Sequence, residues 1–157
     1  MMMERSLVIM KPDAVQRNLV GEIISRFERK GLKIVGLKMM RLDEAVVKEH
    51  YAHHAEKDFF KDLSQFMRSN PVVVLVLEGF HAVEIVRAIS GIKSSDMGSI
   101  RGDYVLSTQK NIIHSSDSVE TARKEVPRFF EKSELFEYEK HDWHHVLSDE
   151  DLKNIGK

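Results

Sequence analysis

The residues best suited to chemistry lie in one short stretch, 111–118, which reads NIIHSSDS. Its two isoleucines are β-branched and apolar, which predicts the end of a buried strand. The residues that follow are common helix N-cap types, and Asp117 with Glu120 fits a capping box. His114 is therefore predicted to stand just before a helix N-terminus, where free backbone N–H groups favour an anion. A neutral imidazole beside an anion is a good phosphoryl acceptor.

Taken alone, His114 also fits a structural histidine satisfied by a hydroxyl. The wider sequence favours the chemical interpretation, because the stretch resembles the nucleoside diphosphate kinase signature Asn-x-x-His-x-Ser-Asp. The resemblance runs from about Arg5 to about Val126. It includes the segments Lys11–Asp13, Val15–Arg17, Leu19–Ile24, Lys48–Tyr51, Pro71–Val73, Glu78–Gly79 and Ile100–Asp103.

Nucleoside diphosphate kinases move the γ-phosphoryl of a nucleoside triphosphate to a nucleoside diphosphate through a phosphohistidine. The resemblance implies a ping-pong mechanism with His114 as the nucleophile and ATP as a donor. It also implies Mg²⁺ as cofactor, held mainly by the nucleotide phosphates rather than by protein ligands. Two alternatives stay open: a catalytically silent nucleotide- or nucleic-acid-binding member of the same fold, and a histidine-based metal-binding protein.

The same resemblance assigns roles to further residues. Besides His114, the implied catalytic residues are Ser116, Glu125, Lys11 and Tyr51. Ser116 would lie next to the imidazole and Glu125 behind it. Nucleotide binding is implied for Lys11, Phe59, Arg87, Lys93, Arg101, Thr108 and Asn111. Guanidinium groups suit phosphate because they donate two parallel hydrogen bonds.

Several of these residues have plainer explanations. Phe59 continues an apolar helix stripe, and Arg87 fits the charged face of an amphipathic helix. His50 and His54 are spaced by one helical turn, and three more histidines cluster around Trp143. Without cysteine or a carboxylate at a metal-motif spacing, these histidines are predicted to be surface or structural residues.

Length and composition bound the class of protein. The chain has 157 residues, 24 Lys and Arg against 25 Asp and Glu, and no cysteine. We expect one domain over 1–157, no bulk attraction to nucleic acid, and a cytoplasmic location. The longest apolar run, 72–77, has the length of a strand, so no membrane association is expected.

The order of the predicted elements indicates an α+β fold. Strands are expected at 7–10, 33–42, 72–77 and up to 113. Helices are expected to end at Gly31, near His53, near Ser69 and at Gly91, with Asp43 and Asp58 as caps of the middle two, and Pro127 should end or bend the last. The segment 93–103 is predicted to be a polar loop. The family resemblance sharpens this to a ferredoxin-like βαββαβ sandwich with a four-stranded antiparallel sheet and additional helices.

Two segments depart from the family pattern. The loop Gly91–Gly98 is shorter than usual and lacks the threonine and proline of Gly-x-Thr-x-Pro, so a phosphate-contacting hydroxyl is lost or supplied by Ser94 or Ser95. The tail 130–157 is charged and unusual, and is predicted to wrap the surface. The family implies a homo-oligomer, most often a hexamer, with a tetramer or dimer as alternatives. The short loop is expected to weaken the step from dimer to hexamer.

Overall fold

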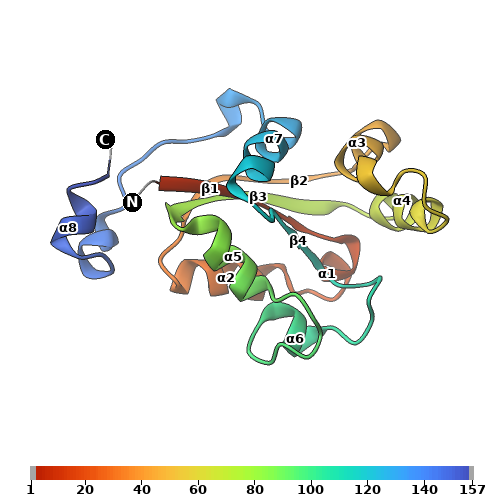
Figure 1. Ribbon diagram of the computed structural model, residues 1–157, viewed down its shortest axis with the longest axis horizontal. Coiled ribbons are helices and arrows are strands. Elements are labelled where there is room, and N and C mark those ends of the chain that lie inside the picture. The colour runs from red at the N-terminus through yellow and green to blue at the C-terminus, as the bar shows by residue number, and fades with distance from the viewer. Residues whose placement is uncertain (1–2, 156–157) are drawn as a thin grey trace.

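The computed structural model describes residues 3–155 as a single sheet with helices on both faces (Figure 1). The strands are β1 (Met3–Met10), β2 (Lys33–Met40), β3 (Val72–Phe80) and β4 (Ile113–Ser115). The helices are α1 (Pro12–Gln16), α2 (Val20–Arg29), α3 (Glu44–His50), α4 (Phe60–Arg68), α5 (Ala82–Ser90), α6 (Ile100–Tyr104), α7 (Val119–Phe129) and α8 (Asp149–Leu152). Short 3₁₀ turns lie at Ala52–His54, Lys132–Glu134 and His141–His145.

The sheet has four strands in the order β2-β3-β1-β4, and each neighbouring pair is antiparallel. Helices α2 and α5 connect β1 to β2 and β3 to β4, which is the βαββαβ connectivity of a ferredoxin-like fold. The predicted α+β fold class is thereby confirmed. The two central strands, β1 and β3, carry the longest pairing, from Met3 opposite Phe80 to Met10 opposite Val73.

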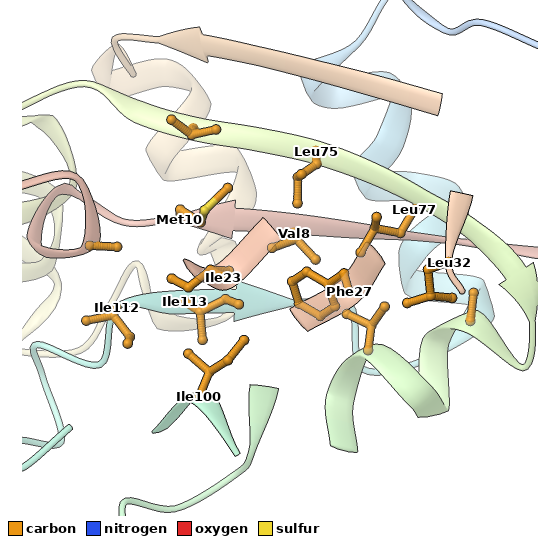
Figure 2. Packing of buried hydrophobic residues seen from close by; sticks show 14 of the residues in the cluster. Val8, Met10, Ile23, Phe27, Leu32, Leu75, Leu77, Ile100, Ile112 and Ile113 are labelled. Carbon is orange, nitrogen blue, oxygen red and sulfur yellow. The ribbon is translucent and has the colours of Figure 1, made fainter. Parts of the chain in front are cut away.

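Each face of the sheet has its own apolar core. On one face, Phe27 and Ile23 of α2 pack against Val8, Leu75 and other strand residues (Figure 2). On the other face, α3, α4 and α7 cover the alternate residues of the same strands. The run 72–77 is buried throughout because β3 is covered on both sides, as its unbroken apolar sequence predicts.

A β-bulge in β2 changes which side chains are buried. The predicted buried face was Val35, Leu37 and Met39, but Leu37 is 51% and Met39 59% exposed. The register against β3 shifts between Ile34 and Gly36, so every later residue turns to the opposite face. Side chains do alternate between the two faces of β2. The prediction of one continuous buried face is wrong, because the bulge exchanges the two faces partway along the strand.

Of three predicted helix starts, one is confirmed and two are wrong. Asp43 caps α3 as expected, accepting from the Val46 N–H across 2.8 Å. Asp58 caps nothing, because α4 begins at Phe60 after a 3₁₀ turn. The cap of α7 is Ser118, which accepts from the Thr121 N–H across 3.0 Å, so the predicted Asp117–Glu120 capping box is wrong.

The ends of two helices also differ. Helix α3 ends at His50 rather than near His53. Helix α7 continues past Pro127 to Phe129, because a proline in the last turn removes little of the helical hydrogen bonding.

The segment predicted as a polar loop contains helix α6, which carries Arg101. Ser99 caps it by accepting from the Gly102 N–H across 3.0 Å. A side chain on Gly102 would overlap the carbonyl of Asp96, so glycine is required where the loop folds against the helix. The short loop therefore packs onto α6 and does not extend freely.

The tail crosses β2, as predicted for a surface wrap. The Phe136 N–H donates to the Val35 carbonyl across 2.8 Å, and Trp143 Nε1 donates to the Gly31 carbonyl across 2.8 Å. Trp143 is buried although its segment has little periodicity. The tail thus runs along β2, the edge strand of the sheet, and bonds to its backbone.

Candidate active site

His114 lies within β4, where it pairs with Ile9 of β1. The sequence placed it after the strand and directly before a helix, but α7 begins only at Val119. The strand pairing, rather than a helix N-terminus, therefore fixes the position of the imidazole. Its side chain is 22% exposed, so one part of the ring faces the solvent-accessible site.

A strained turn precedes His114. Ile112 is fully buried yet has a φ of 56°, and the Ile113 N–H donates to the Asn111 carbonyl across 2.7 Å. Such a conformation in a β-branched residue costs about 1–3 kcal/mol. Asp13 supports it by accepting from the Ile112 N–H across 3.1 Å. Neither the turn nor the role of Asp13 was predicted, because the contact joins residues far apart in the sequence.

Glu125 of α7 bridges the imidazole and a hydroxyl. Its Oε1 lies 2.9 Å from His114 Nε2, and its Oε2 accepts from Ser116 Oγ across 2.6 Å. An ionised carboxylate only accepts, so His114 Nε2 carries the proton. The lone pair of the neutral ring is then on Nδ1. Ser116 and Glu125 thus lie where the resemblance placed them.

Ser116 is itself tied to the central strand β1. The Leu7 N–H donates to Ser116 Oγ across 3.1 Å, and the Ser116 N–H donates to the Leu7 carbonyl across 3.1 Å. Ser116 is fully buried and Glu125 nearly so. Because both groups are satisfied and enclosed, they hold the imidazole in one orientation.

His50 lies beside this pair and was not predicted to belong to it. Its ring centre is 4.5 Å from that of His114, and its Nδ1 is 3.8 Å from Glu125 Oε1. One ligand atom from each of His50, His114 and Glu125 lies within 4.8 Å of the others. Each of the three, however, already has a hydrogen-bonded neighbour, since Arg128 occupies His50 Nδ1. Of the two predicted roles, a surface one fits the exposed His141, His144 and His145, whereas His50 is buried.

Cations gather on the other side of the imidazole. Lys11 is buried and donates to Asn111 Oδ1 across 2.6 Å. Burial, followed by the charge of Arg101, lowers the pKa of Lys11 to about 8. Burial and the neighbouring Arg87 also lower the pKa of Arg101. Positive groups that lower one another's pKa form a site that an anion stabilises.

Arg101 is held in place by backbone carbonyls. Its two terminal nitrogens donate to Gly91 and Ile113, and its buried Nε has no hydrogen-bond partner among residues 3–155. Arg101 and Arg87 both line a cavity of about 570 Å³ that contains His114. Arg87 forms no salt bridge within 3–155, although its charge helps to lower the pKa of Asp117, which lines the same cavity.

A second cavity of about 440 Å³ adjoins the first, because Tyr51 and His54 line both. Its walls include Phe59, Thr108, Lys11 and Asn111. Phe59 is 42% exposed, so it is not the ordinary core residue that its helix stripe also allowed. The Tyr51 hydroxyl reaches Met67 Sδ at 3.8 Å, and burial raises the pKa of Tyr51.

Lys93 lies apart from the imidazole. It lines a third cavity of about 420 Å³ together with Ser94, Ser95, Arg101 and Thr108, but not the one that holds His114. Its backbone N–H donates to Asp96 Oδ2 across 2.8 Å, as does that of Ile92. Asp96 thus holds the short loop through two backbone amides.

The comparisons with known proteins agree with this architecture. The fold matches a halophilic nucleoside diphosphate kinase from Halobacterium salinarum in complex with CDP, with a TM-score of 0.89, 42% identity, and coverage of 92% of this chain and 99% of that one. It also matches a nucleoside diphosphate kinase family protein from Babesia bovis, with a TM-score of 0.88, 38% identity, and coverage of 91% and 99%. The fold is therefore that of a nucleotide phosphotransferase.

The nucleoside diphosphate kinase family profile matches residues 4–135, and the chain belongs to that family. The nucleoside diphosphate kinase of Pyrococcus horikoshii is 53% identical over 147 residues, which is 89% of this chain and 94% of that protein. The chain is therefore an enzyme that transfers phosphoryl groups between nucleotides, which confirms the predicted class over a catalytically silent member. No helix within 3–155 combines the length and apolar character needed to cross a membrane.

Proposed function

We propose that this enzyme transfers the γ-phosphoryl group of ATP and other nucleoside triphosphates to nucleoside diphosphates through a phosphohistidine at His114. The observation that carries the proposal is the hydrogen bond from His114 Nε2 to Glu125 across 2.9 Å. It leaves the Nδ1 lone pair free to attack while Lys11, Arg87 and Arg101 supply positive charge nearby.

In the first half-reaction, His114 Nδ1 forms a bond to the γ-phosphorus and the bond to the bridging oxygen breaks. The nucleoside diphosphate leaves with that electron pair, and the imidazole ring becomes cationic. The Glu125 carboxylate stabilises this charge without accepting a proton, because Nε2–H already donates to it. In the second half-reaction, a terminal oxygen of another diphosphate attacks the same phosphorus and Nδ1 regains its lone pair.

The nucleotide is proposed to bind with its base in the cavity of Phe59 and its phosphates toward His114. Phe59 would stack on the base, Thr108 would oppose it, and Lys11 and Asn111 would contact the ribose region. Mg²⁺ is part of the proposal: the nucleotide phosphates rather than protein side chains would mainly hold it, and it would offset part of their negative charge. Lys93 would bind the phosphates from the adjoining cavity.

Incubation with γ-labelled ATP tests the proposal. The wild-type chain should acquire label that is stable in base and lost in acid, whereas His114→Ala should acquire none and lose transfer by at least about a thousandfold. Circular dichroism should show that the variant folds. Undiminished transfer by purified His114→Ala would contradict the proposal.

A homo-oligomer, most often a hexamer, is also proposed. Leu37 and Met39 are exposed on β2, an edge strand of the sheet, and such apolar edges tend to be covered. Light scattering over a dilution series tests this proposal and the expected weakening of the hexamer. A monomer at micromolar concentration would contradict assembly, and a hexamer at nanomolar concentration would contradict the weakening. A cytoplasmic location, proposed from the cysteine-free composition, is checked by cell fractionation.

A further inference from the structure

The imidazole of His50 lies beside the catalytic pair but has no part in the reaction described above. Its Nδ1 is 3.8 Å from Glu125 Oε1, the same oxygen that lies 2.9 Å from His114 Nε2. The ring is enclosed by His114, Tyr51 and Phe129, with centre-to-centre distances of 4.5, 4.7 and 5.2 Å. One carboxylate oxygen therefore has two imidazole neighbours that could each donate to it.

Arg128 decides which nitrogen of His50 carries the proton. Its Nη1 lies 3.1 Å from His50 Nδ1, and its Nε donates to Glu49 Oε1 across 3.0 Å. A guanidinium has donors and no acceptor, so Nδ1 must be the acceptor and the proton of the neutral ring stands on Nε2. Glu49 anchors Arg128 in this geometry.

The surroundings keep the His50 ring neutral, so the ring carries one proton, which is on either Nδ1 or Nε2. Burial has the largest effect in lowering the pKa of His50. The nearby charged groups are His114 on β4, Arg128 and Glu125 on α7, Lys11 after β1 and His53 in the 3₁₀ turn. All of these except Glu125 disfavour a protonated ring.

We propose that Arg128 and His50 are positioning residues that reserve Glu125 for His114. With Arg128 present, His50 Nδ1 accepts and cannot donate to Glu125. In the other tautomer, Nδ1–H would donate to Oε1 and take part of the negative charge that stabilises the cationic His114 ring during transfer. The inference rests on the proposed role of His114 as the nucleophile, and it concerns how Glu125 is kept free to hold that histidine.

The variant Arg128→Met tests the inference, with Arg123→Met as its control. Arg123 is an exposed arginine on the same helix, outside the hydrogen-bonded network. Nitrogen-15 NMR of the side chain should show the Nε2–H form of His50 in the wild type and the Nδ1–H form in Arg128→Met. Phosphoenzyme formation should slow by about tenfold, or about 1.4 kcal/mol, with little change in KM. Arg123→Met should leave both measurements unchanged.

Two further variants separate positioning from a structural role. Arg128→Lys should restore the Nε2–H tautomer and much of the rate, because an ammonium also only donates. In a His50→Phe background, Arg128→Met should cost no further rate, so the two effects should not add. Additive losses, an unchanged His50 tautomer in Arg128→Met, or a rise in KM alone would overturn the inference.

The wild-type spectrum keeps the test independent of the variants and of catalysis. If Arg128→Met does not fold, a wild-type His50 with its proton on Nδ1 would still refute the inference, and one with its proton on Nε2 would support it. If the wild type forms no phosphoenzyme, the proposed function fails while the His50 tautomer still reports on Arg128.

Discussion

The wall behind His114 and the wall proposed to face a nucleotide base are built differently. Behind the imidazole, Ser116 and Glu125 are buried and hydrogen-bonded to each other and to β1. The facing wall consists of Phe59, which is 42% exposed, and a loop whose residue Thr108 is exposed. The imidazole of His114 is thus held by satisfied, water-excluded contacts, whereas the proposed base site offers an exposed aromatic ring.

Under the proposed function, this difference would let one site combine strict chemistry with broad substrate use. A buried network tolerates little displacement, because each broken contact leaves a polar group without water. A stacking surface accepts any base, since every base has a π face. Lys11 links the two walls, because it lines the cavity of Phe59 and its charge also lowers the pKa of His50, the neighbour of His114.

The strongest test removes the carboxylate from the buried wall. Glu125→Ala should slow phosphoenzyme formation by about a hundredfold or more, because the ring loses both its orientation and its counter-charge. Rapid-quench measurement with labelled ATP gives this rate. Glu120→Ala, an exposed glutamate of the same helix, is the matched control and should be unchanged. A loss below about threefold in Glu125→Ala would show that the two walls do not differ as described.

The second test follows the pH dependence of the residue that joins the walls. With a pKa of about 8, Lys11 is cationic below that pH and becomes neutral as the pH rises through it. The value of kcat/KM should therefore fall above about pH 8, by up to about tenfold per pH unit. Lys11→Arg should retain its charge and move this decline to higher pH. A basic limb at the same pH in both enzymes would assign it to another group.

The third test concerns the stacking wall. Phe59→Ala should raise KM for ADP, GDP, CDP and UDP by about tenfold each, because stacking contributes about 1–3 kcal/mol per base. The ratios between the four substrates should change by less than about threefold. Phe136→Ala removes an exposed ring from the tail and serves as control. A wild-type preference above about a hundredfold for one base would require an edge-reading residue on this wall.

The smallest effect is expected in the short loop. Asp96 Oδ2 accepts from the N–H groups of Ile92 and Lys93, and these bonds lower the pKa of Asp96. Asp96→Ala should raise hydrogen exchange of those two amides about tenfold and raise KM only a few-fold, since the loop lies beside the cavity of His114. Asp58→Ala, an aspartate that caps no helix, is the control. Unchanged exchange would mean that packing against α6 alone holds the loop.

Much of the fold could be read from local patterns. The run 72–77 is apolar throughout because β3 is covered on both faces, and Asp43 caps α3 because its oxygen reaches an N–H three residues on. The bulge in β2 could not be predicted from the sequence, because the alternation of residues along the strand continues unchanged through it. Helix α6 was missed because its short sequence has no clear period and its cap, Ser99, looks like any loop serine.

The candidate site divides in the same way. The residue types around His114 and the order of the matching segments determined the reaction class, because His114, Ser116 and Glu125 all lie within the short stretch 114–125. Tertiary structure decided the details that set the chemistry: the strained Ile112, the placement of His114 within β4, and the contact of Arg128 with His50. Those contacts join residues as far apart as 78 and 99 positions. No local sequence pattern predicts contacts between residues so far apart in the chain, because they form only once the sheet and α7 have packed together.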